Sequence, residues 1–443
     1  MTVVPAPLDN DSCDTAIRAD FVHFLSDPDN SGDAVEYIED GLLLLKQGRV
    51  RQLVPAADWI DFLPDGSHLY DYSGRLVMPG FIDTHTHYPQ TEMIASHGLQ
   101  LLDWLQQYTF PTEMKFAERE HADRIAAFFC EQMLRNGTTT SAVFATVHAQ
   151  SVDAIFEQAQ RRDLCLVAGK VMMDRNAPPA LCDSAESSYR DCSELIRRWH
   201  LKGRCHYAVT PRFAPCSSPA QLEICGQLLA EQPDLYLQSH LAENRAEVDW
   251  VARLFPDSRS YLDVYDSFGL LGPRSIYGHC IHLDRQDRER MAASGAAIAF
   301  CPTSNLFLGS GLFRLDDARE QGIRVGVATD VGAGTSFSML QTLAEAYKVC
   351  QLAGQRLTPL KAFYLATLGA AQALYLDHRI GNFGVGKEAD LVVLELGATE
   401  LMQCRMENAS TLEERLFALM MLGDDRCVQA THVMGKRQYS RNH

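Results

Sequence analysis

The feature that most limits how this chain can fold is a series of short β-prone segments that alternates with helix-like stretches. The β-prone segments span 81–87, 138–144, 164–172, 205–213, 235–243, 275–280, 296–304 and 323–330. Between them, stretches such as 121–137 and 151–162 have apolar residues at helical spacing. A strand followed by a helix, repeated about eight times over roughly 300 residues, predicts an α/β chain that forms a (β/α)₈ TIM barrel.

The two ends of the chain have a different pattern. Residues 1 to about 75 carry short apolar stretches that are broken by turn signals at 27–33 and 64–67. After about residue 385, short strand-like runs return at 389–396 and 431–440. We therefore expect a small β domain built from both ends. The expected divisions are 1–78 for its first part, 79–384 for the barrel and 385–443 for its second part.

Composition narrows the range of partners and compartments. The net charge of −17 repels phosphate backbones and anionic membrane surfaces, so we expect neither nucleic acid nor membrane as a partner. No apolar stretch approaches the roughly 18 residues of a membrane span, and the first residues lack the pattern of a signal peptide. The 13 cysteines are an odd number without a C-x-x-C pair. This usage favours a reducing, cytoplasmic compartment.

Polar side chains that can bind a metal stand at the ends of several predicted strands. His85 and His87 end the first β-prone segment, and residues two apart on a strand face the same side. His240, His279 and Asp330 stand at the ends of three later segments. Active sites of such barrels lie at the carboxyl ends of the strands, and imidazole suits zinc or iron. One such residue alone is more often structural, but the whole set predicts a metal site.

Glu243 follows His240 by three residues, just beyond the predicted strand end. A carboxylate in that position can move protons beside a metal, but it can equally be a solvated acid in a loop. Arg212 and Phe213 end the fourth β-prone segment. The arginine offers a fixed fork of hydrogen-bond donors, or else forms a surface ion pair. The phenylalanine can stack on a flat ring or belong to the core.

Several segments resemble the amidohydrolase superfamily. They are residues 78–87 (MPGFIDTHTH), 240–244 (HLAEN), 278–280 (GHC), 328–330 (ATD) and 386–395 (GKEADLVVLE). Members with two metals bridge them with a carboxylated lysine on the fourth strand. Here the fourth segment has no lysine, and Lys170 lies on the third. The resemblance therefore implies a barrel of the amidohydrolase type with one metal.

Within this superfamily the chain is most similar to the guanine deaminase family. The resemblance rests on residues 86–90, 101–113, 136–140, 169–178, 210–218, 300–311 and 329–342. It implies one Zn²⁺ per chain, although Fe²⁺ would also suit the ligands. The implied metal ligands are His85, His87, His240 and Asp330. The implied catalytic residues are Glu243 as proton shuttle, His279 as the residue that orients water, and Asp330.

The same resemblance implies a substrate and its contacts. The substrate would be guanine, hydrolysed to xanthine and ammonia, and the contacts would be Gln90, Arg212 and Phe213, with His240 and Trp104 beside them. The resemblance further implies a homodimer and a β-sandwich formed from both chain termini. Trp104, with Leu105 and Phe110, lies after the first strand, where the three can form a lid or simply pack an amphipathic helix.

Two alternatives remain open from the sequence. The chain could deaminate or dechlorinate another heterocycle, such as cytosine, an s-triazine or a pterin. It could also be an inactive relative kept as a binding protein. The presence of all four ligand positions and of Glu243 argues against the second alternative, and the set Gln90, Arg212 and Phe213 favours guanine over other heterocycles.

Overall fold

The computed structural model describes residues 13–98 and 100–441, and its larger sheet is a parallel barrel. The barrel strands are β5 (Phe81–His87), β6 (Thr138–Phe144), β7 (Cys165–Gly169), β9 (Cys205–Pro211), β10 (Tyr236–Leu241), β11 (Ser275–His279), β12 (Ala297–Phe300) and β13 (Arg324–Val327). Each lies within one of the eight segments that the sequence marked. Backbone bonds from His87 N to Val331 O (2.7 Å) and from Asp330 N to His85 O (2.9 Å) join the first strand to the last. The prediction of an α/β barrel is confirmed.

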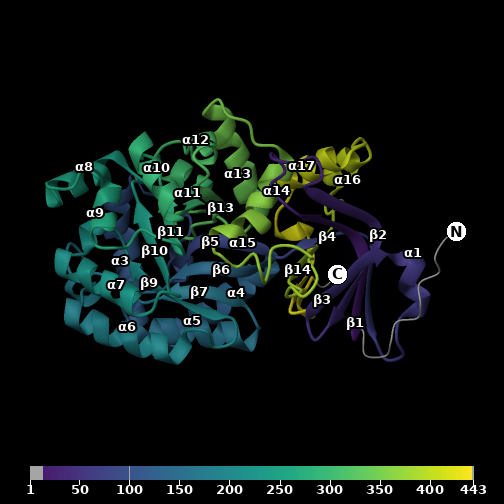
Figure 1. Cartoon of the computed structure of the whole chain (residues 1–443), viewed down its shortest axis with the longest axis horizontal. Helices are drawn as coiled ribbons and strands as arrows, with labels where there is room; N and C mark the ends of the chain where they lie inside the picture. Colours follow the sequence, from purple (N-terminus) through teal and green to yellow (C-terminus); the bar gives the residue numbers. More distant parts are fainter. Residues whose placement is uncertain (1–12, 99, 442–443) are drawn as a thin grey trace.

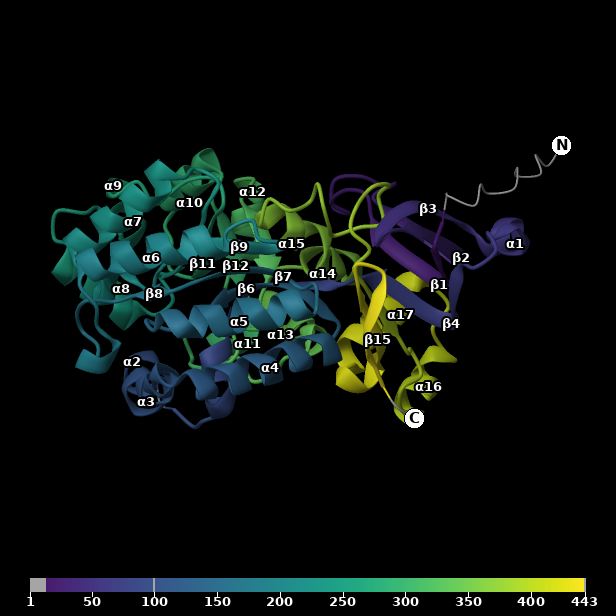
Figure 2. The same cartoon turned by 90° about the horizontal axis from the view of Figure 1, so that it is seen from below.

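Helices cover the outside of the barrel (Figures 1 and 2). They include α4 (Arg119–Arg135), α5 (Ala149–Arg161), α6 (Ala185–Trp199), α7 (Pro219–Glu231), α8 (Arg245–Leu254), α9 (Tyr261–Ser267), α10 (Arg285–Ser294), α11 (Pro302–Phe307), α12 (Leu315–Glu320), α13 (Met339–Leu352) and α14 (Pro359–Leu365). The short helix α15 (Leu368–Ala373) instead packs its alanines in one cluster with strand residues such as Ile82 and Val167. On α4 the buried residues include Ala122, Ile125, Ala126, Phe129 and Met133. This helical period explains why the segment packs one face on the barrel.

The third β-prone segment is one strand in the sequence pattern but two in the structure. β7 ends at Gly169, and a second short strand, β8 (Val171–Met172), follows and also pairs with β9. A side chain at Gly169 is excluded, because a Cβ there would lie 1.8 Å from Ala208 O on β9. The buried Lys170 between the two strands pairs with Asp183, so its amino group is used within this region.

Both chain ends contribute to a second, seven-stranded sheet in the order β16-β15-β14-β4-β1-β2-β3. Its strands are β1 (Thr15–Phe24), β2 (Val35–Lys46), β3 (Arg49–Pro55), β4 (His68–Pro79), β14 (Leu391–Leu394), β15 (Val428–Val433) and β16 (Lys436–Ser440). β4 pairs parallel with β1 and antiparallel with β14, which joins the two ends of the chain. Figure 1 shows these purple and yellow strands side by side, apart from the barrel. The proposed division after residue 78 would assign Pro79, the last residue of β4, to the barrel.

A cluster of buried ion pairs connects the barrel to this sheet. Arg204, beside the start of β9, bonds Asp390 through Nη1 (3.1 Å) and Nη2 (2.5 Å). Its Nε also lies 3.0 Å from Glu388, which Arg379 contacts from another direction at 2.7 Å. Asp390 and Glu388 belong to the 386–395 segment. These two acids of the segment therefore stabilise the junction between barrel and sheet.

Two further observations concern the described residues as a set. None of their helices combines the length and apolarity that crossing a bilayer requires. All 13 cysteines fall within this part of the chain, and each is a free thiol.

Candidate active site

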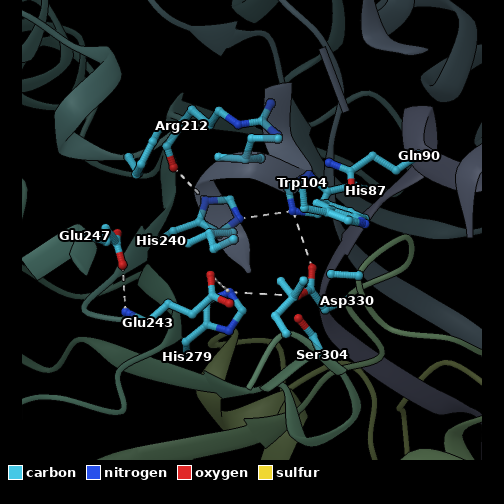
Figure 3. Close-up of a pocket in the computed structure, with 15 residues that line it drawn as sticks. His87, Gln90, Trp104, Arg212, His240, Glu243, Glu247, His279, Ser304 and Asp330 are labelled. Atoms are coloured by element: carbon cyan, nitrogen blue, oxygen red, sulfur yellow. Dashed lines mark hydrogen bonds and ion pairs between the residues drawn. The ribbon is translucent and has the colours of Figure 1, made fainter. Parts of the chain in front are cut away.

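The carboxyl end of the barrel brings together the histidines that the sequence placed at strand ends. His85 and His87 come from β5 and are nearly inaccessible to solvent, and His240 comes from β10 and is partly buried. The Nε2 atoms of His87 and His240 are 3.1 Å apart. One ligand atom from each of the three side chains lies within 4.8 Å of the others. Figure 3 shows this contact between His87 and His240 as a dashed line.

His279, the last residue of β11, and Asp330, three residues after β13, complete this cluster. Asp330 Oδ1 lies 3.4 Å from Nε2 of both His85 and His87. His279 Nε2 lies 3.8 Å from Asp330 Oδ2. His279 (φ 70°) and Asp330 (φ 50°) both have the left-handed backbone that non-glycine residues rarely adopt. Such a conformation costs about 1–3 kcal/mol and persists where the surrounding structure enforces it.

Gly278, before His279, makes room for this arrangement. A Cβ at that position would lie 2.8 Å from Cε1 of His85 and 3.0 Å from its Nδ1. The rigid backbone of β11 would then collide with a buried imidazole. The glycine of the GHC segment is therefore required by the close packing of His85, independently of its own φ angle.

The charge states and tautomers of the cluster suit a divalent cation. Burial lowers the pKa of His85, His87 and His240, so these imidazoles are neutral near pH 7. His240 Nδ1 donates to Arg212 O at 2.6 Å, which leaves the Nε2 lone pair directed at the cluster. Burial acts to raise the pKa of Asp330, but neighbouring imidazoles, above all His85, lower it to about 2.

Two buried ring nitrogens of the cluster, His85 Nε2 and His87 Nδ1, have no hydrogen-bond partner within the described structure. The three neutral imidazoles lie close together, and the Asp330 carboxylate contacts two of them, which is a kind of ligand set that zinc and iron accept. The residues present therefore fit a metal ion. A carboxylated lysine is not part of this set, because Lys170 is paired with Asp183 elsewhere.

Glu243 lies beside the cluster in a buried and partly apolar setting. Its Oε1 accepts from Ser310 Oγ at 2.8 Å, and its Oε2 lies 3.4 Å from His279 Nε2. Burial raises the pKa of Glu243, which favours the protonated carboxylic acid. His279 Nδ1 donates to Asn305 Oδ1 at 2.8 Å, and this bond fixes the orientation of the imidazole. The group is therefore arranged as an acid next to the candidate metal ligands, and it is not a solvated loop residue.

A second acid, Glu247, accepts hydrogen bonds from the backbone beside Glu243. Its Oε2 accepts from the backbone nitrogens of Glu243 (2.9 Å) and Asn244 (3.1 Å) at the start of α8. Its Oε1 accepts from Tyr261 at 2.8 Å. Burial raises the pKa of Glu247 to about 7. These bonds fix the backbone that carries Glu243.

Gln90 and Arg212, which the sequence analysis expected to contact the substrate, lie on the other side of the pocket. Gln90 follows β5 and Arg212 follows β9, and Figure 3 shows both beside His87 and His240. Arg212 Nη1 donates to both carboxylate oxygens of Glu113, at 2.9 and 2.7 Å. Gln90 Nε2 donates to the same Glu113 at 3.1 Å. Arg212 is thus in a buried ion pair, and the surface ion pair considered above does not apply.

The segment after β5 covers the pocket. It forms α2 (Leu101–Trp104), a π-helical turn (Leu105–Thr109) and α3 (Phe110–Met114). Trp104 and Leu105 line the cavity together with Phe213, and Trp104 Nε1 donates to Ser96 O at 3.1 Å. Phe110 does not line it. The ring of Phe110 instead lies 5.7 Å from the guanidinium carbon of Arg212.

The structure thus brings every sequence-inferred site residue to one end of the barrel. The sequence analysis did not identify four further residues that form hydrogen bonds to these groups, namely Glu113, Glu247, Asn305 and Ser310. Only one of these had a local signal, because Asn244 and Glu247 form the N-x-x-E spacing of a helix capping box. The others lie in segments used for the family resemblance, but no spacing rule marks their side chains.

Comparison with known proteins identifies relatives over nearly the whole chain. The profile of the amidohydrolase family matches residues 76–437. Guanine deaminase of Escherichia coli (strain K12) is 52% identical over 430 residues, which cover 96% of this chain and 98% of that protein. A solved structure of E. coli guanine deaminase has a TM-score of 0.95 at 52% identity, and covers 97% of this chain and 100% of that one. Guanine deaminase from C. acetobutylicum, solved with guanine bound in its active site, has a TM-score of 0.86 at 29% identity, and covers 96% of this chain and 100% of that one.

Proposed function

This chain belongs to the amidohydrolase family, and we propose that it is a guanine deaminase, which hydrolyses guanine to xanthine and ammonia. The observation that carries the proposal is the pocket itself. Metal-binding side chains and the acid Glu243 line one part of it, and the pair Gln90 and Arg212 lines another. The high identity to E. coli guanine deaminase over 96% of the chain supports guanine as the substrate over other heterocycles.

We propose that His85, His87, His240 and Asp330 bind the metal, and that the metal is Zn²⁺, with Fe²⁺ also compatible with the ligands. When bound, such an ion would lower the pKa of water from about 15.7 toward about 7 and so supply the nucleophile at neutral pH. The support is the neutral state of the imidazoles, the ionised Asp330 and the unpartnered His85 Nε2.

The reaction replaces the amino group on C2 of guanine by oxygen. Asp330 accepts a proton from the attacking water, while His279, held by Asn305, orients the oxygen toward C2. Glu243 donates its proton to the ring nitrogen next to C2, which makes that carbon more electrophilic. The two water protons then restore the acid on Glu243 and convert the amino group to ammonia as the C2–N bond breaks. Acid–base assistance of this kind contributes about 10²–10⁴ in rate.

Binding requires groups that recognise the flat ring and its polar edge. We assign Phe213 and Trp104, which line the cavity, to the ring faces, and Gln90 and Arg212 to the edge. His240 contributes indirectly as well, because its imidazole bonds the backbone oxygen of Arg212. The buried position of all these groups excludes water when substrate is bound, which strengthens each polar contact.

The test is ammonia release and the ultraviolet change with guanine, beside adenine, cytosine and an s-triazine, with metal measured on the same sample. Turnover of guanine with about one zinc per chain is the expected result. Turnover of another heterocycle alone would refute the substrate, and full activity in a metal-free sample would refute the metal.

We further propose that the enzyme is a cytoplasmic homodimer. The free state of all 13 cysteines supports a reducing compartment. Sedimentation equilibrium of the purified protein tests the dimer, and cell fractionation tests the location. A monomer at micromolar concentration would contradict the first, and recovery in a secreted fraction would contradict the second.

A further inference from the structure

Glu113 is a buried carboxylate that no catalytic step above uses. It lies on α3, in the segment that covers the pocket, and its side chain has no exposed area. It links the two residues proposed to bind the polar edge of the substrate. Arg212 Nη1 donates to both of its oxygens, and Gln90 Nε2 donates to Oε1. These residues come from three separate segments of the chain. A buried, fully paired acid at such a junction constrains the geometry of both neighbours.

The chemistry of a carboxylate fixes which way Gln90 points. A carboxylate paired with arginine accepts hydrogen bonds and donates none. The amide nitrogen of Gln90 must therefore face Glu113, and the amide oxygen must face away from it. Within the described chain, no hydrogen bond occupies Gln90 Oε1 or Arg212 Nη2. The pair thus offers the pocket one acceptor and one donor.

This donor and acceptor match the edge of guanine next to the reacting carbon. C2 is bonded to N1, which carries a hydrogen, and N1 is followed by the carbonyl at C6. Arg212 can donate to the carbonyl oxygen, and Gln90 Oε1 can accept the N1 hydrogen. A purine with an amino group at C6 has the opposite pattern, since its N1 has a lone pair and its substituent donates.

We propose that Glu113 is a positioning residue that selects purines with a carbonyl at C6 and a hydrogen on N1, by fixing the amide of Gln90 and the guanidinium of Arg212. The proposal rests on the guanine deaminase activity proposed above. Glu113 itself touches neither substrate nor metal in this account. It determines which hydrogen-bonding pattern the pocket accepts, and a mismatched edge would leave buried polar groups unpaired.

The test compares Glu113→Gln with wild type on guanine, 2,6-diaminopurine and 2-aminopurine. All three carry the reacting amino group on C2, but only guanine has the carbonyl and the N1 hydrogen. In the variant, the new amide can donate to Gln90 Oε1 and so turn the Gln90 amide around. We expect the ratio of kcat/KM for guanine over 2,6-diaminopurine to fall by about 10²-fold. The metal content should not change.

The matched control is Asp390→Asn. It makes the same acid-to-amide change in another buried arginine pair, at the junction of barrel and sheet. That variant should lose stability and keep the wild-type selectivity ratio. If Glu113 served only to stabilise the fold, Glu113→Gln would lower kcat/KM for all three purines equally. An unchanged ratio in the folded variant would overturn the proposal.

Two results separate this inference from the function on which it rests. Absence of ammonia release from guanine by the wild-type enzyme would reject the proposed function. Preference for guanine by the wild type, with the same preference in Glu113→Gln, would reject only the role of Glu113. Should Glu113→Gln fail to fold, Gln90→Met removes the same acceptor and should reduce the ratio by about tenfold or more. An unchanged ratio in Gln90→Met would also overturn the proposal.

Discussion

Replacement of Glu243 by glutamine is the sharpest test of the proposed mechanism, because the structure predicts that the site will tolerate it. Glutamine has the same shape, and its amide oxygen can still accept from Ser310 Oγ, which lies 2.8 Å from Glu243 Oε1. Its amide nitrogen would face His279 Nε2, now 3.4 Å from Oε2. The Glu243 carboxylate is the main group that raises the pKa of His279, so its loss favours the neutral ring, in which Nδ1 donates to Asn305 and Nε2 can accept. Little packing or hydrogen bonding is therefore lost.

The cost should then appear in the chemistry alone. A glutamine amide cannot donate a proton to the ring nitrogen or carry one to the leaving amine. We expect kcat to fall by about 10²–10⁴-fold, which corresponds to about 3–5 kcal/mol in the activation barrier. Metal content should remain normal, because Glu243 belongs neither to the group His85, His87 and His240 nor to the neighbouring group His85, His279, Cys301 and Asp330, whose ligand atoms lie close enough to hold an ion.

The assay is single-turnover ammonia release with guanine, accompanied by metal analysis and by the urea midpoint of each sample. Ser310→Ala is a useful companion, because it removes one hydrogen bond from Glu243 and leaves the acid in place. It should reduce kcat far less than Glu243→Gln does. A metal-replete Glu243→Gln enzyme with kcat within tenfold of wild type would refute the assigned role.

Three further predictions concern the metal and the stability of the fold. Asp330→Asn should weaken metal retention and slow turnover, while zinc added after chelation should restore only the wild type; equal metal content and equal kcat would contradict this. Asp390→Asn leaves Arg204 partly unpaired in a buried site and should lower the free energy of unfolding by about 3–5 kcal/mol in urea titrations; a loss below 1 kcal/mol would show that the pair is solvated. Burial lowers the pKa of His432 from 6.5 to about 4, because the folded protein favours the neutral imidazole. The unfolded chain therefore binds a proton more readily, and the free energy of unfolding should fall as the pH decreases from 6.5 to 4. The loss should be about 3 kcal/mol, and His432→Gln, which can still accept from Tyr72, should remove that pH dependence; an identical pH profile in the variant would refute it.

The parts of the fold and site that the sequence predicted are those with short, repetitive signals. The barrel strands are short β-prone runs. His85 and His87 follow from the two-residue period of β5, and Asp330 follows from the end of β13 at the barrel rim. The break in the third run was not predictable by period. It depends on how closely Gly169 approaches Ala208 O of the neighbouring strand, which is a tertiary distance.

The groups that position other groups were the ones missed. Asn305 orients His279 from 26 residues away, and Glu113 meets Arg212 from 99 residues away. No local pattern encodes such pairs, because each partner in isolation is an ordinary polar residue. Phe110 shows the same limit in reverse. The sequence left open whether it joins Trp104 and Leu105 as a lid or packs an amphipathic helix, and its ring lies against the guanidinium of Arg212.

The origin of these residues separates the two tasks of the pocket. The groups proposed for the chemistry come from strand ends, where backbone bonds such as Asp330 N to His85 O hold them together. The groups proposed for substrate choice depend on Glu113, which belongs to the covering segment after β5. A change in that segment can therefore alter which heterocycle is accepted without moving the metal ligands. This is a physical reason why selectivity should respond to Glu113 while metal content does not, and a variant of Glu113 that lost metal in proportion to selectivity would contradict the separation.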